Sequence, residues 1–161
     1  MFIESNDYIT GRKQIATSAG CEVVSTRFSL SLQAVEMTAN NIGNIGILPA
    51  GCVPVAMIVD ADQLDSGAAV TFAFGVSNAE VKNNLHGNVP TDISVLPENG
   101  GAVWVTAIDT AKQGGQAQFY SLALSRVKPV QYDRYLALKV VTAAATGVAG
   151  EIGVTLLYRS V

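Results

Sequence analysis

Three aspartates between two expected strands are the densest group of side chains that could bind a metal ion. Asp60, Asp62 and Asp65 supply carboxylate oxygens, which are the ligands that calcium prefers. Their spacing lacks the central glycine and distal glutamate of a calcium-binding loop. Aspartates at the end of a strand also accept hydrogen bonds from the amides of the following turn. We therefore expect a polar turn here and no metal site.

The other reactive residue types are too sparse for catalysis. His86 is the only histidine, whereas metal-dependent jelly-roll enzymes need a cluster of imidazole ligands. A serine or cysteine nucleophile needs an oriented base, and no Gly-x-Ser-x-Gly motif occurs. The glutamates are scattered and are interpreted as surface charge: Glu36, Glu80, Glu98 and Glu151. We therefore expect that the protein is not an enzyme and that it has no catalytic residue and no cofactor.

The cysteine and glycine residues form no recognisable reactive site, whereas the tyrosines leave one alternative function open, the binding of a carbohydrate. Without a secretory leader at the start of the chain, Cys21 and Cys52 are expected to be reduced and packed as small apolar groups. The pair Gly43 and Gly46 is not followed by the lysine of a phosphate-binding loop. Four tyrosines could line a core edge or stack on sugars: Tyr120, Tyr132, Tyr135 and Tyr158.

The composition favours a protein that contacts other proteins. Of the 161 residues, 49% are hydrophobic and only 14% are charged, and the net charge is −3. This excludes intrinsic disorder, and it argues against a nucleic-acid partner because no excess of lysine and arginine is present. No apolar run is long enough to span a membrane, so no membrane partner is expected. A surface with few charges costs little to desolvate in an interface.

Period-two patterns predict an all-β protein. Phe28, Leu30 and Leu32 alternate with polar residues, as do the apolar residues of 70–76 and 152–158. Further strands are predicted at 53–59, 102–108, 118–127 and 135–142, with a loop at 40–46 and a possible short helix at 78–85. The segments 135–142 and 152–158 are predicted to form a hairpin. On the second face of 70–76, small residues would allow another backbone or subunit to approach closely.

These elements predict an antiparallel β-sandwich, a jelly roll of about eight strands, with an N-terminal arm. The predicted boundaries are 1–22 for the arm and 23–161 for the sandwich domain. The arm has no sustained periodicity. It is expected either to fray or to lie across a neighbouring subunit.

Two stretches carry a family resemblance. The first runs from Leu48-Pro49-Ala50-Gly51 through a valine strand and the turn Asp65-Ser66-Gly67 to an alternating strand that ends at Gly75-Val76. The second, residues 135–158, contains a run of alanine and threonine followed by an alternating strand. Together they resemble the jelly-roll capsid decoration (cement) proteins of tailed bacteriophages.

The resemblance implies a structural protein of the virion, without catalytic residues. It would decorate the outer capsid surface as a homotrimer, assembled in the host cytoplasm, and clamp neighbouring subunits of the major capsid protein. The family's N-terminal arms imply a capsid or subunit interface at Tyr8, Ile9, Arg12 and Lys13. The alternative is a β-sandwich binding module on the virion surface that recognises a host glycan or receptor.

Overall fold

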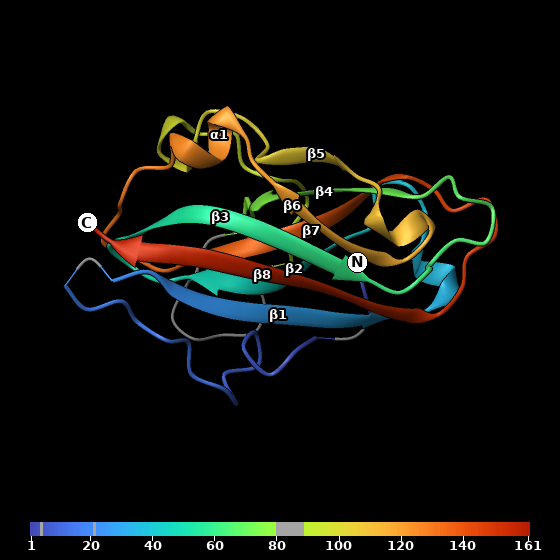
Figure 1. The fold of residues 1–161 in the computed structure, drawn as a ribbon, viewed down its shortest axis with the longest axis horizontal. Helices are drawn as coiled ribbons and strands as arrows, with labels where there is room; N and C mark the ends of the chain where they lie inside the picture. The colour runs from blue at the N-terminus through green and yellow to red at the C-terminus, as the bar shows by residue number, and fades with distance from the viewer. Residues whose placement is uncertain (4, 21, 80–88) are drawn as a thin grey trace.

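The computed structural model describes residues 1–3, 5–20, 22–79 and 89–161, and its described residues form two packed β-sheets (Figure 1). The strands are β1 (Val24–Leu32), β2 (Ile42–Leu48), β3 (Cys52–Ala61), β4 (Thr71–Val76), β5 (Val105–Ile108), β6 (Gly115–Phe119), β7 (Arg134–Thr142) and β8 (Gly150–Ser160). The helical turns are η1 (Ala34–Glu36), η2 (Pro97–Asn99), η3 (Thr110–Lys112) and α1 (Leu122–Ser125).

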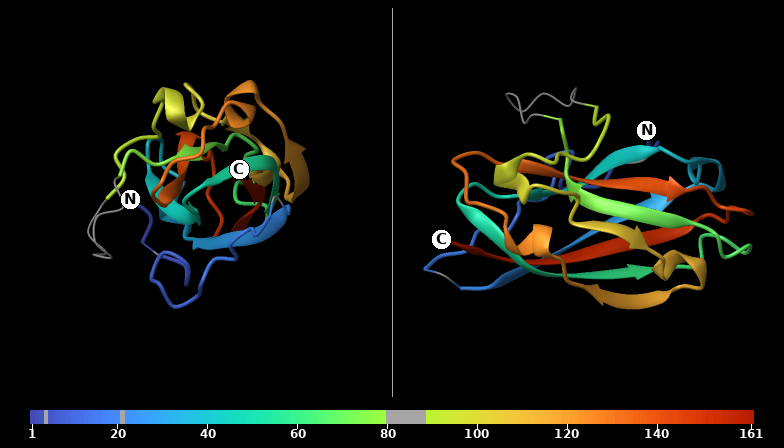
Figure 2. Two further views of the ribbon diagram at one scale, coloured as in Figure 1. Left: turned by 90° about the vertical axis from the view of Figure 1, so that its left-hand side faces the viewer. Right: turned by 90° about the horizontal axis from the view of Figure 1, so that it is seen from above.

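Each sheet has four antiparallel strands, in the orders β1-β8-β3-β6 and β2-β7-β4-β5. The end-on view in Figure 2 shows the two layers facing each other. The side chains between them are apolar and fully buried, among them Phe28, Met57, Phe72, Phe74 and Leu156. The predicted antiparallel sandwich of about eight strands is confirmed.

The alternating patterns were reliable guides to the inner faces of the strands. In β1, Phe28, Leu30 and Leu32 are buried, and in the paired strand β8, Ile152 and Val154 are buried. Successive side chains of a strand point to opposite faces, so the apolar set enters the core.

The predicted hairpin between 135–142 and 152–158 is wrong. Both segments are strands, but β7 lies in one sheet and β8 in the other. Residues 143–149 cross between the sheets, and the amides of Ala145 and Thr146 donate to the carboxylate of Asp65. Alternation shows that a strand has one buried face, but it does not show which strand lies beside it. A strand buries its apolar face in the core whichever of the two sheets it belongs to.

Two further boundaries differ from prediction. Most of the predicted loop 40–46 belongs to β2, where a β-bulge between Asn44 and Gly46 interrupts the alternation that would have revealed a strand. The predicted strand 118–127 ends at Phe119. Ser121 then caps α1, its Oγ accepting a hydrogen bond from the Leu124 amide at 3.0 Å. The possible helix at 78–85 lies mostly outside the described residues.

The small residues on the outer face of β4 contact the chain's own backbone. A Cβ added to Gly75 would lie 2.7 Å from Cγ2 of Ile93 and 3.4 Å from the amide nitrogen of Trp104. Ala73 and Ile93 also belong to a small buried cluster on this face. The close approach expected from the sequence is therefore made here within the chain.

Cys52 is buried as a free thiol, whereas Cys21 lies outside the described residues. No helix in the described part of the chain is long and apolar enough to cross a membrane.

Candidate interaction surface

Asp65 organises the turn that follows β3. Its side chain is fully buried and accepts hydrogen bonds from five backbone amides, those of Gly67, Ala69, Val70, Ala145 and Thr146. Burial acts to raise the pKa of this carboxyl group, but the amide hydrogen bonds outweigh burial and hold the pKa well below its usual range. Asp65 thus joins the turn after β3 to the crossover at 143–149.

The other two aspartates of the sequence cluster point to different partners. Asp60 and Glu151 both accept hydrogen bonds from Arg27, whose side chain crosses β8 above Gly153, where a Cβ would collide with it. Asp62 accepts a hydrogen bond from the Glu151 amide at 2.8 Å. Within the described residues, no group of three metal-ligating side chains gathers.

The N-terminal arm lies along the edge where β1 and β2 face each other, below β1 in Figure 1. Asn6 Nδ2 donates to the carbonyl oxygen of Ser29 in one sheet and to that of Ile45 in the other. Phe2 is buried, and its ring packs against the backbone at Gly43. The arm thereby bridges the two sheets of its own chain.

The arm residues implied by the resemblance occupy a turn beyond Asn6. The ring of Tyr8 meets Phe28 edge-on with 5.0 Å between centroids, and Lys13 Nζ lies 4.9 Å from the centroid of the Tyr8 ring. Ile9 is half-buried and Arg12 is exposed. Their role in an interface with capsid or subunit stays a prediction.

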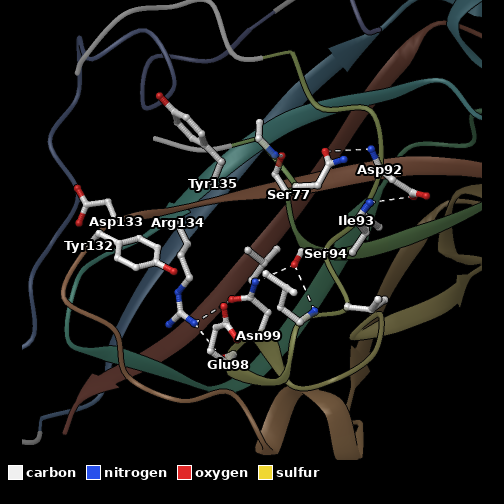
Figure 3. Close-up of a pocket in the computed structure, with 15 residues that line it drawn as sticks. Ser77, Asp92, Ile93, Ser94, Glu98, Asn99, Tyr132, Asp133, Arg134 and Tyr135 are labelled. Carbon is white, nitrogen blue, oxygen red and sulfur yellow. Dashed lines mark hydrogen bonds between the residues drawn. The ribbon is translucent and has the colours of Figure 1, made fainter. Parts of the chain in front are cut away.

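A cavity of about 800 Å³ opens beside the C-terminal end of β4 and the N-terminal end of β7 (Figure 3). It is lined by residues from the end of β4, the segment before η2 and the start of β7: Val76, Ser77, Asn78, Ala79, Asp92, Ile93, Ser94, Val95, Leu96, Glu98, Asn99, Tyr132, Asp133, Arg134 and Tyr135. Three distant parts of the chain thus meet at one site.

Arg134 is the buried cation of this cavity. Its side chain is only 3% exposed, and the guanidinium donates to the carbonyl oxygens of Cys52 and Glu98 and to Asn99 Oδ1. Burial lowers the pKa of Arg134 from its ordinary value. Its Nε is buried without a hydrogen-bond partner among the described residues, which is an energetic cost in the isolated chain.

The rim of the cavity combines apolar and acidic side chains. Val95, Leu96 and Tyr132 are exposed. Among the described residues, the carboxylates of Glu98 and Asp133 have no ion-pair partner, although Asp133 accepts a hydrogen bond from the Ala50 amide. Apolar contact surface and carboxylates without a direct ion pair therefore lie side by side, and Glu98 interacts with Arg134 only at longer range.

Sequence reasoning singled out Tyr132 and Tyr135 but missed Arg134. A signal was available, because period-two counting places residue 134 on the same face as Leu136, Leu138 and Val140, all of which are buried. Tyr158, in contrast, is a core residue that bonds to Thr26 and Ala16, and Tyr120 is exposed elsewhere. His86 lies outside the described residues.

Similarity to known proteins was found among solved structures. No family model matches the chain, and no curated protein matches it. A chain of the capsid of Ralstonia phage GP4 shares 26% identity with a TM-score of 0.80, over 99% of this chain and 97% of that one. The likeness supports a phage capsid-related protein. A chain of the cyanophage Pam1 capsid asymmetric unit, at 16% identity, TM-score 0.51 and coverage of 92% and 94%, shares the fold.

Proposed function

We propose that this protein decorates the outer surface of a tailed-phage head, as a homotrimer that clamps neighbouring subunits of the major capsid protein. The observation that carries the proposal is the near full-length likeness to a chain of the Ralstonia phage GP4 capsid. The role is mechanical, without catalysis or a cofactor. The protein is assembled in the host cytoplasm, and neither nucleic acid nor a membrane is its partner.

The surface chemistry supports a role in contacts. With only 14% charged residues, the protein can bury much of its outer surface at a low desolvation cost. Large apolar side chains remain exposed on several elements: Val35, Val55, Val95, Leu96, Tyr120, Leu122 and Tyr132. A stable interface buries roughly 800 Å² on each partner, so such side chains are needed on the contacting face.

Heating of phage particles tests the proposal. Particles that lack the protein should release their DNA at a lower temperature, and added purified protein should restore the wild-type temperature. Bovine serum albumin at equal concentration serves as the control. Equal release temperatures with and without the protein would refute clamping. Mass measurement in solution should give a trimer; a monomer would contradict the symmetric clamp.

A second candidate function has one observation in its favour. Tyr132 and Tyr135 both line the cavity, and tyrosine rings pack well against sugar rings. The chain would then be a binding module on the virion surface for a host glycan or receptor. A glycan array with the purified protein tests this candidate, together with host adsorption by particles that lack it. No array signal and normal adsorption would remove it.

A further inference from the structure

We propose that the cavity beside Arg134 receives an extended segment of the major capsid protein that carries an apolar side chain next to a lysine or arginine. The inference rests on the proposed function and assigns the capsid contact to one face of the molecule. That face contains the end of β4, the segment before η2 and the start of β7 (Figure 3).

The apolar part of the segment is inferred from the rim. Val95, Leu96 and Tyr132 are 58%, 55% and 55% exposed, although each lies beside a cavity with room for further side chains. Burial of an apolar side chain against them would remove apolar surface from water on both partners. A cavity with exposed apolar side chains on its rim suits an anchoring side chain of a partner, because hot-spot residues cluster in well-packed pockets.

The basic part of the segment is inferred from charge. Glu98 and Asp133 line the cavity without an ion-pair partner among the described residues, whereas Asp92, also in the lining, pairs with Lys139 at 2.9 Å. The whole chain carries a net charge of −3. Glu98 interacts electrostatically with the buried Arg134, but the lining as a whole keeps an excess of carboxylates, so a lysine or arginine near Asp133 or Glu98 would be attracted.

Arg134 does not reverse this preference, because the lining holds three carboxylates, those of Asp92, Glu98 and Asp133, and only this one guanidinium. Its guanidinium is directed to the oxygens of Glu98 and Asn99 (Figure 3) and to the carbonyl oxygen of Cys52. Arg134 is almost completely buried. It therefore supports the floor of the cavity by tying the start of β7 to η2. The groups that an incoming segment meets first are the apolar rim and the two carboxylates.

Two substitutions test the two parts of the proposal separately. Leu96→Asp puts a charge on the apolar rim; residue 96 is the N-cap of η2, where aspartate is favourable, so the fold should survive. Glu98→Lys reverses one rim charge and removes no side-chain hydrogen bond of the described structure. The matched controls are Val23→Asp, at an exposed position just before β1, and Asp109→Lys, at the exposed start of η3.

Binding is measured by co-sedimentation with shells assembled from the major capsid protein alone, at two salt concentrations. We expect Leu96→Asp and Glu98→Lys each to weaken binding at least tenfold, and Glu98→Lys also to weaken the salt dependence. Both controls should stay within twofold of the wild type. Circular dichroism verifies folding of every variant, and Leu96→Ser replaces Leu96→Asp if the latter does not fold.

The outcomes separate this inference from the proposed function. Failure of the wild-type protein to bind shells would overturn the decoration role itself. Shell binding by the wild type with equal binding by Leu96→Asp and Glu98→Lys would overturn the cavity assignment alone. A glycan-array signal that Leu96→Asp abolishes would show that the cavity binds a sugar, and would overturn the peptide proposal.

Discussion

The hydrogen bonds of Asn6 predict that the N-terminal arm stabilises the sandwich. Nδ2 of Asn6 donates to Ser29 O at 3.1 Å and to Ile45 O at 2.5 Å, and its Oδ1 accepts from the amides of Tyr8 and Ile9 at 3.2 and 3.1 Å. One side chain thus holds the turn of the arm and joins β1 of one sheet to β2 of the other. Asn6→Ala removes all four hydrogen bonds at once.

The expected loss of folding stability in Asn6→Ala follows from these four hydrogen bonds. Each hydrogen bond contributes about 0.5–1.5 kcal/mol net. Water can hydrate the two amides of the turn after the substitution, so the loss lies in the lower half of the sum, about 2–4 kcal/mol. For a domain of this size we expect Tm to fall by roughly 5–15 °C.

Calorimetry measures the fall in Tm, and limited trypsin digestion measures the release of the arm from the sandwich. Arg12 and Lys13 are exposed trypsin sites in the arm, and a released arm should be cleaved there much faster than the docked one. Gln14→Ala is the matched control, since Gln14 is exposed in the same arm. If Asn6→Ala has the same Tm and the same rate of cleavage as Gln14→Ala, the arm does not bridge the sheets.

Two other contacts make measurable predictions. Because the folded-state pKa of Asp65 is depressed, its contribution to stability is complete above the unfolded pKa of about 4 and is lost as pH falls through the folded pKa. The Tm of the wild type should therefore fall below pH 4, while Asp65→Asn should start lower at pH 7 and show a flatter pH profile; parallel profiles would contradict the assignment. Gly75→Ala places a Cβ against Ile93 and should cost about 1–3 kcal/mol in unfolding experiments with urea. The double variant with Ile93→Ala should lose less stability than the sum of the two single changes, and strict additivity would show that the two residues do not touch.

The inner faces of the strands could be predicted because one rule governs them. In β1, β4 and β8 the apolar residues recur at every second position, and those residues are buried in the structure. The rule fails where the backbone departs from regular pleating. The bulge between Asn44 and Gly46 shifts the pattern in β2, and Phe28 packs directly over Gly46, a position with no side chain to count.

Strand neighbours could not be predicted, because pairing is decided by long-range contacts. β7 and β8 are consecutive and both alternate, yet the segment between them crosses from one sheet to the other. Asp65 holds that crossover from a turn far away in the sequence, through the amides of Ala145 and Thr146. The sequence favoured Asp65 as a turn former, but nothing local identified the second segment it binds.

The candidate site was harder to predict than the fold, because it depends on which outer surfaces the chain leaves uncovered. The small residues on β4 predicted the close approach of another backbone or subunit to its outer face. The chain's own segment around Ile93 occupies that position. The arm likewise covers the edge of β1 and β2. The rim around Leu96 and Glu98 is one of the surfaces left uncovered in the described part of the chain, and it lies on a segment with no periodicity. Alternation along a strand reports the face that the sheet buries within its own chain. Residues that a partner would cover carry no such pattern. They stand out only as apolar or charged side chains that the chain's own contacts leave exposed.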